Sequence, residues 1–134
     1  MTLHAYQGGS WKGAAPYAYN AGTWKLATSV SAYDAGSWKT VAEILSLVNI
    51  TGTTTVANGA TVNLGTTVTG GYGSLTYLWA KNSGTGSISG SATNSTVTIL
   101  SGANNQEGEY QVTVTDSLTG TAIVQPVTIT WGTP

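Results

Sequence analysis

Tyr110-Gln111-Val112-Thr113-Val114 alternates between an apolar and a polar side chain at every step. Successive side chains of a β-strand point to opposite faces, so a period of two is typical of a strand that buries one face and exposes the other. The β-branched valines and the aromatic ring also favour a strand over a helix. The stretch therefore predicts one half-buried β-strand.

Similar stretches lie on both sides of this strand. They are 47–50, 54–56, 60–64, 75–79, 96–99 and 127–131. Clusters of Gly, Ser and Asn separate them, and these residue types favour turns. Short strands at this spacing are typical of a β-sandwich. The sequence predicts an all-β fold with a sandwich over residues 47–134.

The composition excludes several classes of protein. Charged residues are 7% of the chain, against about 25% in an ordinary soluble domain. The absence of Cys excludes disulfides and thiolate metal sites. A net charge of −1 without any Arg does not favour nucleic-acid binding, since no basic patch is available for phosphates. The longest apolar run, near residues 41–50, is shorter than the roughly 20 residues of a membrane span, so we expect no membrane insertion.

The first 39 residues contain a threefold repeat built on Tyr, Gly, Trp and Lys. Its copies are Tyr6-Gln-Gly-Gly-Ser-Trp11-Lys12, Tyr19-Asn-Ala-Gly-Thr-Trp24-Lys25 and Tyr33-Asp-Ala-Gly-Ser-Trp38-Lys39. In each copy a glycine (Gly9, Gly22 or Gly36) falls where a three-residue hairpin loop needs a positive φ angle. The repeat predicts three small β-hairpins.

These patterns divide the chain into three parts. Residues 1–40 form the hairpin repeat segment, residues 41–46 form a connector, and residues 47–134 form the sandwich. A lone hairpin is only marginally stable in water, so the repeat segment needs a partner surface. We therefore expect it to serve assembly.

The aromatic residues of the repeat are the candidate binding residues. They are Tyr6, Trp11, Tyr19, Trp24, Tyr33 and Trp38. A regular set of exposed aromatics is typical of a protein interface, and repetition suits assembly around an axis, which favours a homo-oligomer and a trimer in particular. The alternative is stacking of the indole rings on the sugars of a host-surface glycan, as in a carbohydrate-binding module of a secreted bacterial protein.

Residues 47–134 resemble the immunoglobulin-like (Ig-like) domains of bacteria and phages. Trp79 stands where that family places the core Trp of its strand C, and Glu107-Gly108-Glu109-Tyr110 is similar to the tyrosine corner that opens strand F. The resemblance implies that Trp79 and Tyr110 belong to the core, with the Tyr hydroxyl hydrogen-bonded to backbone. The family's disulfide positions are apolar here, so the resemblance implies a sandwich held by packing alone.

The repeat segment is similar to segments in structural proteins of tailed bacteriophages. Together with the Ig-like resemblance, this implies a virion component whose repeat segment binds other virion proteins or oligomerises. The Ig-like domain would be displayed outward, for weak contact with the host surface or for stabilising the particle. Tail, fibre, neck, baseplate and capsid stay open, with a slight preference for tail or fibre. Residues 1–6 lack the features of a secretory signal, which suits synthesis in the host cytoplasm.

The sequence offers no catalytic constellation, and we expect neither enzyme activity nor a cofactor. His4 is the only imidazole and has no nucleophile near it in sequence. Glu107 and Glu109 lie two apart on one strand and share a side, so they cannot flank a sugar as glycosidase carboxylates do. Asp116 with Asn104 and Asn105 is a weak calcium candidate, because hard cations need several converging oxygens. We therefore expect no metal site.

Overall fold

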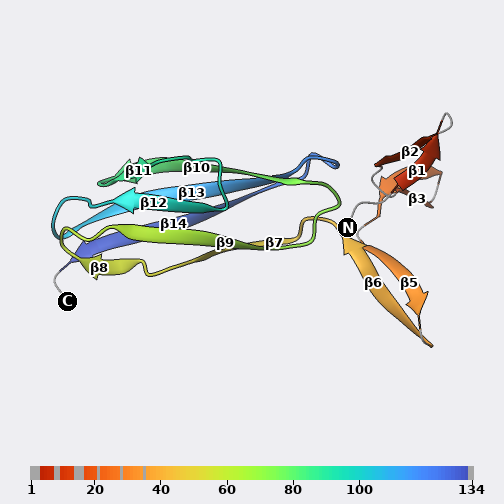
Figure 1. The fold of residues 1–134 in the computed structure, drawn as a ribbon, viewed down its shortest axis with the longest axis horizontal. Coiled ribbons are helices and arrows are strands. Elements are labelled where there is room, and N and C mark those ends of the chain that lie inside the picture. The colour runs from red at the N-terminus through yellow and green to blue at the C-terminus, as the bar shows by residue number, and fades with distance from the viewer. Residues whose placement is uncertain are drawn as a thin grey trace. The chain divides into compact units, whose positions relative to one another are not determined.

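The computed structural model describes residues 4–7, 10–13, 17–20, 22–27, 29–34 and 36–132. Every regular element in these ranges is a β-strand (Figure 1), so the all-β prediction is confirmed. No helix that could cross a membrane occurs within the described residues. By its contacts the chain divides into two compact units, which are described separately below.

The first part of the chain forms three antiparallel two-stranded hairpins. They pair β1 (His4–Gln7) with β2 (Ser10–Gly13), β3 (Tyr17–Asn20) with β4 (Thr23–Leu26), and β5 (Ser29–Asp34) with β6 (Ser37–Glu43). The turn glycines Gly22 and Gly36 have φ angles of 83° and 84°, a conformation that only Gly adopts at low cost. Each connection has two residues and not the expected three, because Asn20 pairs with Thr23 and Asp34 with Ser37.

The third hairpin is longer than the sequence analysis predicts. Strand β6 continues to Glu43, and its partner β5 contains an irregularity between Val30 and Ser31. Residues 41–43 are therefore strand and not connector, which leaves only residues 44–46 between β6 and the next strand. The pairing of Val30 with Ala42 and of Ser29 with Glu43 supplies the backbone partners that make this extension stable.

The remaining strands form two four-stranded sheets, which lie in two layers (Figure 1). The strands are β7 (Leu47–Thr51), β8 (Thr55–Ala57), β9 (Val62–Thr69), β10 (Leu75–Gly84), β11 (Ser87–Ser89), β12 (Thr96–Leu100), β13 (Gln106–Asp116) and β14 (Ala122–Gly132). One sheet has the order β10-β13-β14-β8 and the other the order β11-β12-β9-β7. Strand β8 runs parallel to β14, whereas β12 is antiparallel to both β9 and β11.

One strand of the sandwich lies outside the predicted stretches. Strand β11 is only three residues long, and its Ser-Ile-Ser sequence gives no clear alternation. Gly108 lies inside β13 and is buried. A Cβ at this position would lie 2.9 Å from the Tyr110 ring and 3.2 Å from the Trp131 ring, so the glycine makes room for two aromatic side chains.

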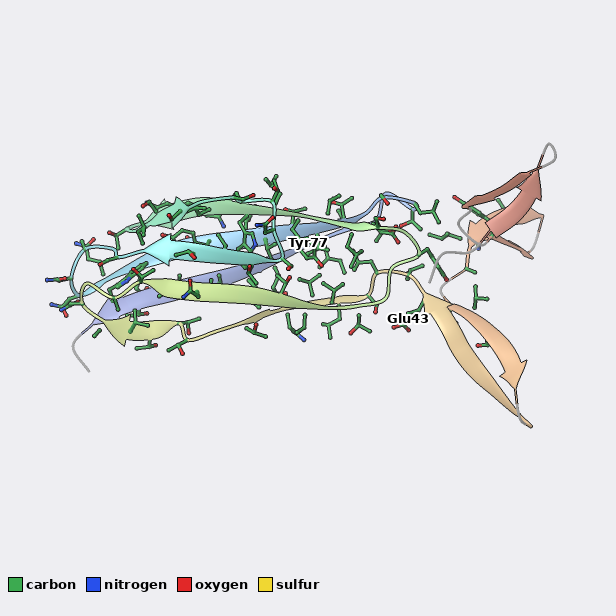
Figure 2. The ribbon with its side chains drawn as sticks, in the orientation of Figure 1. Glu43 and Tyr77 are labelled. Carbon is green, nitrogen blue, oxygen red and sulfur yellow. The ribbon has the colours of Figure 1, made fainter. Side chains whose placement is uncertain are left out.

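The core lies between the two sheets. Its fully or almost fully buried apolar side chains are Val48, Val62, Leu64, Trp79, Val97, Ile99, Tyr110, Val112, Val114, Ile129 and Trp131. On β13 the buried side chains alternate with more exposed ones, as the period of two predicts. Tyr77 on β10 (Figure 2) is half-buried. Trp79, two residues further along the strand and thus on the same face, is buried. Burial of this aliphatic and aromatic surface is the main force that holds the sandwich together.

The two compact units differ from the predicted division at residue 47. One unit contains residues 48–68, 76–114 and 123–134, which is most of the sandwich. The other contains residues 1–47 together with residues 69–75 and 115–122, the connections that follow β9 and β13. Within this second unit, Gly71 N–H donates to the Glu43 carbonyl at 2.8 Å and Ser46 N–H to the Thr69 carbonyl at 3.0 Å.

Candidate functional site

The six repeat aromatics occupy one equivalent position in all three hairpins. Cα register pairs Tyr6 with Trp11, Tyr19 with Trp24, and Tyr33 with Trp38. The residue before each Tyr likewise pairs with the Lys that follows each Trp. The side chains of these six aromatics and of His4 lie outside the described part of the structure. Their role as an assembly interface or a glycan platform therefore stays a prediction.

Trp79 and Tyr110 both lie in the core. Trp79 is 2% exposed and its Nε1 donates to the Asn94 carbonyl at 3.0 Å. Tyr110 is fully buried and its hydroxyl donates to the Thr85 carbonyl at 2.8 Å. Burial raises the pKa of the Tyr110 hydroxyl above its usual value. The expected hydrogen bond from this hydroxyl to backbone is therefore present, but its acceptor lies 25 residues earlier, further upstream than in a tyrosine corner.

Glu107 and Glu109 are exposed on the same face of β13. Glu107 accepts a hydrogen bond from the Thr130 hydroxyl at 3.1 Å, and Glu109 accepts one from the Ser83 hydroxyl at 2.6 Å. These bonds cross to the neighbouring strands β14 and β10. The two carboxylates therefore pair with hydroxyls on the outer face of one sheet, which agrees with the prediction that they share a side.

Asp116 is the buried polar side chain of the described part of the chain, and its carboxylate is surrounded by donors. It accepts backbone N–H hydrogen bonds, at 2.7 to 3.4 Å, from Tyr72, Gly73, Leu118 and Thr119. Burial raises the pKa of this carboxyl, but these hydrogen bonds lower it by more, so the pKa lies below its usual value. N–H groups compete with a cation for the carboxylate oxygens, and so the weak calcium candidate has no geometric support.

Tyr72 lies beside Asp116 and is also fully buried. Its hydroxyl donates to the Ala27 carbonyl at 2.9 Å, which connects the residues between β4 and β5 to the connection that follows β9. Burial raises the pKa of this hydroxyl, and the negative charges of Glu43 and Asp116 raise it further. Tyr72 and Asp116 together organise the smaller compact unit, and sequence reasoning did not single out either for this role.

Trp131 is a second core residue that the sequence analysis placed on a strand without assigning it a role. It is fully buried, and its Nε1 donates to the Ala60 carbonyl at 2.8 Å. Its position at the end of the alternating stretch Val127–Trp131 was a usable signal, because every second residue there faces one side. The signal for Asp116 was the Asp-Ser-Leu-Thr-Gly sequence, which is typical of a turn closed by the Asp side chain.

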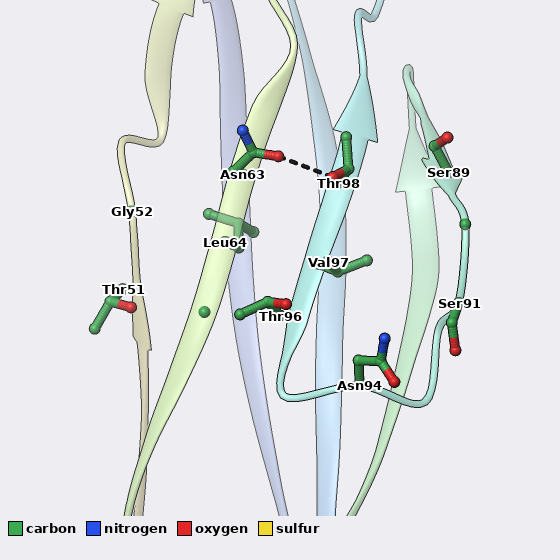
Figure 3. A pocket seen from close by; sticks show the side chains of 12 residues that line it. Thr51, Gly52, Asn63, Leu64, Ser89, Ser91, Asn94, Thr96, Val97 and Thr98 are labelled. Carbon is green, nitrogen blue, oxygen red and sulfur yellow. Dashed lines mark hydrogen bonds between the residues drawn. The ribbon is translucent and has the colours of Figure 1, made fainter.

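A shallow groove of about 520 Å³ lies on the sheet β11-β12-β9-β7 (Figure 3). Its lining residues are Thr51, Gly52, Asn63, Leu64, Gly65, Ser89, Gly90, Ser91, Asn94, Thr96, Val97 and Thr98. Leu64 and Val97 are buried and belong to the core beneath, so the exposed lining consists of hydroxyls, amides and backbone. Cross-strand pairs form the floor, Asn63 with Thr98 and Gly65 with Thr96.

Within the described part of the chain, the side chains of Asn63, Thr98 and Ser91 are hydrogen-bonded, and the other polar side chains of the groove are not. Thr98 donates to Asn63 Oδ1 at 2.8 Å (Figure 3), which leaves the Asn63 amide nitrogen free. The side chains of Asn94 and Thr96 make no hydrogen bond in the described part of the structure, although the Asn94 carbonyl accepts one from Trp79. The groove therefore presents unused donors and acceptors to the solvent.

One comparison with known proteins bears on this chain. It is 41% identical over 69 residues to a decoration protein of Escherichia phage T5. The matched region is 52% of this chain and 40% of that protein, so the chain spans well under half the length of this relative. No family model and no solved structure matches. The similarity supports a structural role in a phage, and it favours such a role over an enzymatic one.

Proposed function

We propose that this chain decorates the surface of a phage particle. The similarity to a phage decoration protein carries this proposal. It favours the capsid surface among the particle locations left open by the sequence, in place of the preference for tail or fibre. A virion location and other virion proteins as partners follow from the same similarity.

The hairpin repeat segment, residues 1–40, is the part that we assign to attachment. Three hairpins with one shared Tyr–Trp register give the chain three copies of one small unit. Repeated units of this kind suit a particle surface, which itself repeats around symmetry axes. On this proposal the aromatics contact a virion protein or a second copy of the chain, and a trimer is the favoured oligomer.

The sandwich is the part that we assign to outward display, as an Ig-like domain. Its strand order supports the Ig-like assignment. Taking β7, β9, β10, β11, β12, β13 and β14 as strands A, B, C, D, E, F and G, the sheets have the orders D-E-B-A and C-F-G. Strand β8, paired with β14, lies beside strand G. Many functions occur on this fold, so the fold alone does not identify what the displayed domain contacts.

Labelling of intact particles tests the proposed location. Purified particles of the phage that encodes this chain would be treated with gold-labelled antibody against it and viewed by electron microscopy. We expect label spread over the capsid. Label confined to the tail or its fibres would contradict capsid decoration, and absence of the chain from purified particles would contradict any virion role.

Substitution in the repeat tests the attachment segment. The full chain with Trp24→Ala should bind particles that lack the protein more weakly than the unchanged chain, while the sandwich keeps its melting temperature. Thr128→Val on β14 is the control, since Thr128 is exposed on the sandwich and far from the repeat in sequence. Equal particle binding by the two variants would show that Trp24 does not contribute to attachment.

A further inference from the structure

We propose that the groove on the sheet β11-β12-β9-β7 binds a neutral oligosaccharide. The groove lies entirely within the larger compact unit, so its shape does not depend on the hairpins. Its volume of about 520 Å³ is within the range of roughly 300 to 1,000 Å³ that is usual for small-molecule sites. Charge, hydrogen-bonding capacity and shape each support this class of ligand.

The charge of the groove favours a neutral ligand. None of its twelve lining residues is ionisable, and strands β7, β9, β11 and β12 contain no charged residue at all. The exposed charges of the sandwich, such as Lys81, Glu107 and Glu109, belong to strands β10 and β13 of the other sheet. An anionic sugar or a nucleic acid would find no cation here to offset the loss of its hydration.

The free polar groups of the groove match the hydroxyl groups of a sugar. The Asn63 amide nitrogen donates, the Asn94 amide both donates and accepts, and the Thr96 hydroxyl does both. None of these groups is used inside the described structure. A sugar hydroxyl is likewise a donor and an acceptor, so each can pair with a groove side chain without leaving an unsatisfied group on either side.

Gly65 gives the groove its depth. It lies in the middle of β9, where a strand normally carries a side chain, and a Gly there often marks close approach of another molecule. Its φ angle is not in the left-handed region, so the backbone does not require glycine. A Cβ at this position would lie 3.1 Å from Thr51 Oγ1 and would fill the floor between Thr51 and Thr96. The missing side chain at position 65 therefore keeps the groove open, and the backbone conformation of the strand does not require it.

The lining favours an oligosaccharide over a protein partner. Protein interfaces are enriched in aromatic residues, Met and Arg at their centres and depleted in Ser. The groove has no aromatic residue and no Met or Arg, and it has Ser89 and Ser91 at one side. Without an aromatic ring for stacking, binding by one copy will be weak, with a dissociation constant of about 1 mM. Many copies on one surface would raise the effective affinity.

This inference extends the proposed display role but does not depend on it for its test. Binding is measured on the isolated full chain, with no phage particle present. The groove can therefore bind sugar in a protein that is found not to decorate particles, and a decoration protein can lack sugar binding. A negative sugar titration would therefore leave the decoration proposal standing, and a negative particle labelling would leave the sugar-binding proposal standing.

Nuclear magnetic resonance titration of the full chain tests the groove. The probes are maltohexaose, cellohexaose and mannohexaose, with an oligogalacturonate as the anionic control, each up to about 10 mM. We expect at least one neutral probe to shift the backbone amide signals of Gly65, Gly90 and Asn94, and the anionic probe to shift none of them. Absence of shifts with all three neutral probes, or shifts confined to other strands, would overturn the proposal.

Matched variants separate binding from stability. Thr96→Val keeps the shape of the side chain and removes the hydroxyl, so it should weaken binding by about 3- to 10-fold, while Thr128→Val on the other sheet should not change it. Gly65→Leu should abolish binding, and Gly132→Leu, where a Cβ meets nothing within 4 Å, should not. If Gly65→Leu fails to fold, Thr96→Val still decides: unchanged affinity in that variant would contradict the assigned groove.

Discussion

The carboxylate of Asp116 accepts a 2.7 Å hydrogen bond from the backbone N–H of Tyr72, a residue 44 positions earlier in the chain. Tyr72 in turn donates its hydroxyl to the Ala27 carbonyl at 2.9 Å. Three segments that are far apart in sequence are thus tied by one buried carboxylate and one buried phenol. The smaller compact unit depends on these polar contacts, since the described core lies largely in the other unit.

Asp116→Asn should lower the free energy of unfolding of this unit by about 2 to 4 kcal/mol. The amide keeps one acceptor oxygen, but its NH₂ group would face backbone N–H donors that have lost their acceptor. Hydrogen exchange of the Tyr72 and Leu118 amides is the measurement, because both donate to this carboxylate. Exchange as slow as in the unchanged chain would contradict the role of the carboxylate.

The stability of the same unit should fall in acid. The pKa of Asp116 is lowered in the folded state. The ionised carboxylate therefore contributes fully to the free energy of unfolding above the unfolded-state pKa of about 3.9, and this contribution is lost as the pH falls through the lower folded-state pKa. Circular dichroism melts between pH 6 and about pH 2 measure this loss. In Asp116→Asn the loss should be smaller, and an equal loss in both proteins would assign it to other carboxylates.

Alkaline unfolding should begin above about pH 10. The pKa values of Tyr72 and Tyr110 are raised in the folded state, so the unfolded chain releases their protons first and stability declines as the pH rises past the unfolded value. Tyrosinate absorbance followed against pH would show these two hydroxyls titrating together with unfolding. Tyr110→Phe should remove part of the effect and cost about 1 to 3 kcal/mol, because the Thr85 carbonyl loses its donor.

Gly86→Ala should be more damaging than Gly59→Ala. Both glycines have a positive φ angle, 81° and 83°, so both substitutions carry a backbone cost of about 1 kcal/mol. Only at Gly86 would the new Cβ meet other atoms, at 2.5 Å from the Tyr110 hydroxyl and 2.7 Å from Trp131 Cη2. We expect a further loss of about 1 to 3 kcal/mol there. Equal urea midpoints for the two variants would show that the aromatics move aside freely.

Trp79→Ala should unfold the sandwich or leave it near its melting point at room temperature. Truncation of a buried Trp costs about 3 to 5 kcal/mol, and a domain of this size has about 5 to 15 kcal/mol in total. The variant also removes the donor to the Asn94 carbonyl. A cooperative melt at an unchanged temperature would contradict the central place of Trp79. Leu78→Ala is the control on the same strand, because Leu78 is 54% exposed.

The alternation of side chains made most of the sandwich predictable. Strands β7, β10, β12, β13 and β14 contain their predicted stretches in full, and β8 and β9 overlap theirs, because one face of most of these strands packs on the core and the other meets water. Strand β11 was not predicted, because the three residues Ser-Ile-Ser are too few to show a period of two. The extension of β6 to Glu43 also escaped, because it depends on pairing with Ser29 and Val30 and not on the pattern of its own residues.

The polar features were harder to predict, since each depends on partners that are distant in sequence. The sequence placed Asp116 at a turn but gave no sign that Tyr72 and Gly73 would also donate to it. The groove is made by residues from four strands and from the connections that follow β7 and β11, none of which is unusual by itself. Gly65 within a strand was the one local signal, and glycine is too common in this chain for that signal to stand out.

The charge-free sheet has a consequence for the conditions under which this surface works. A surface without fixed charge gathers no counterions. Added salt therefore has no surface charge to screen and no counterions to displace. Contacts made through hydroxyls and amides on such a face keep nearly the same strength in dilute media and in brine. Two particles that present this face also do not repel each other electrostatically across it, so hydration of its hydroxyls is what keeps them apart.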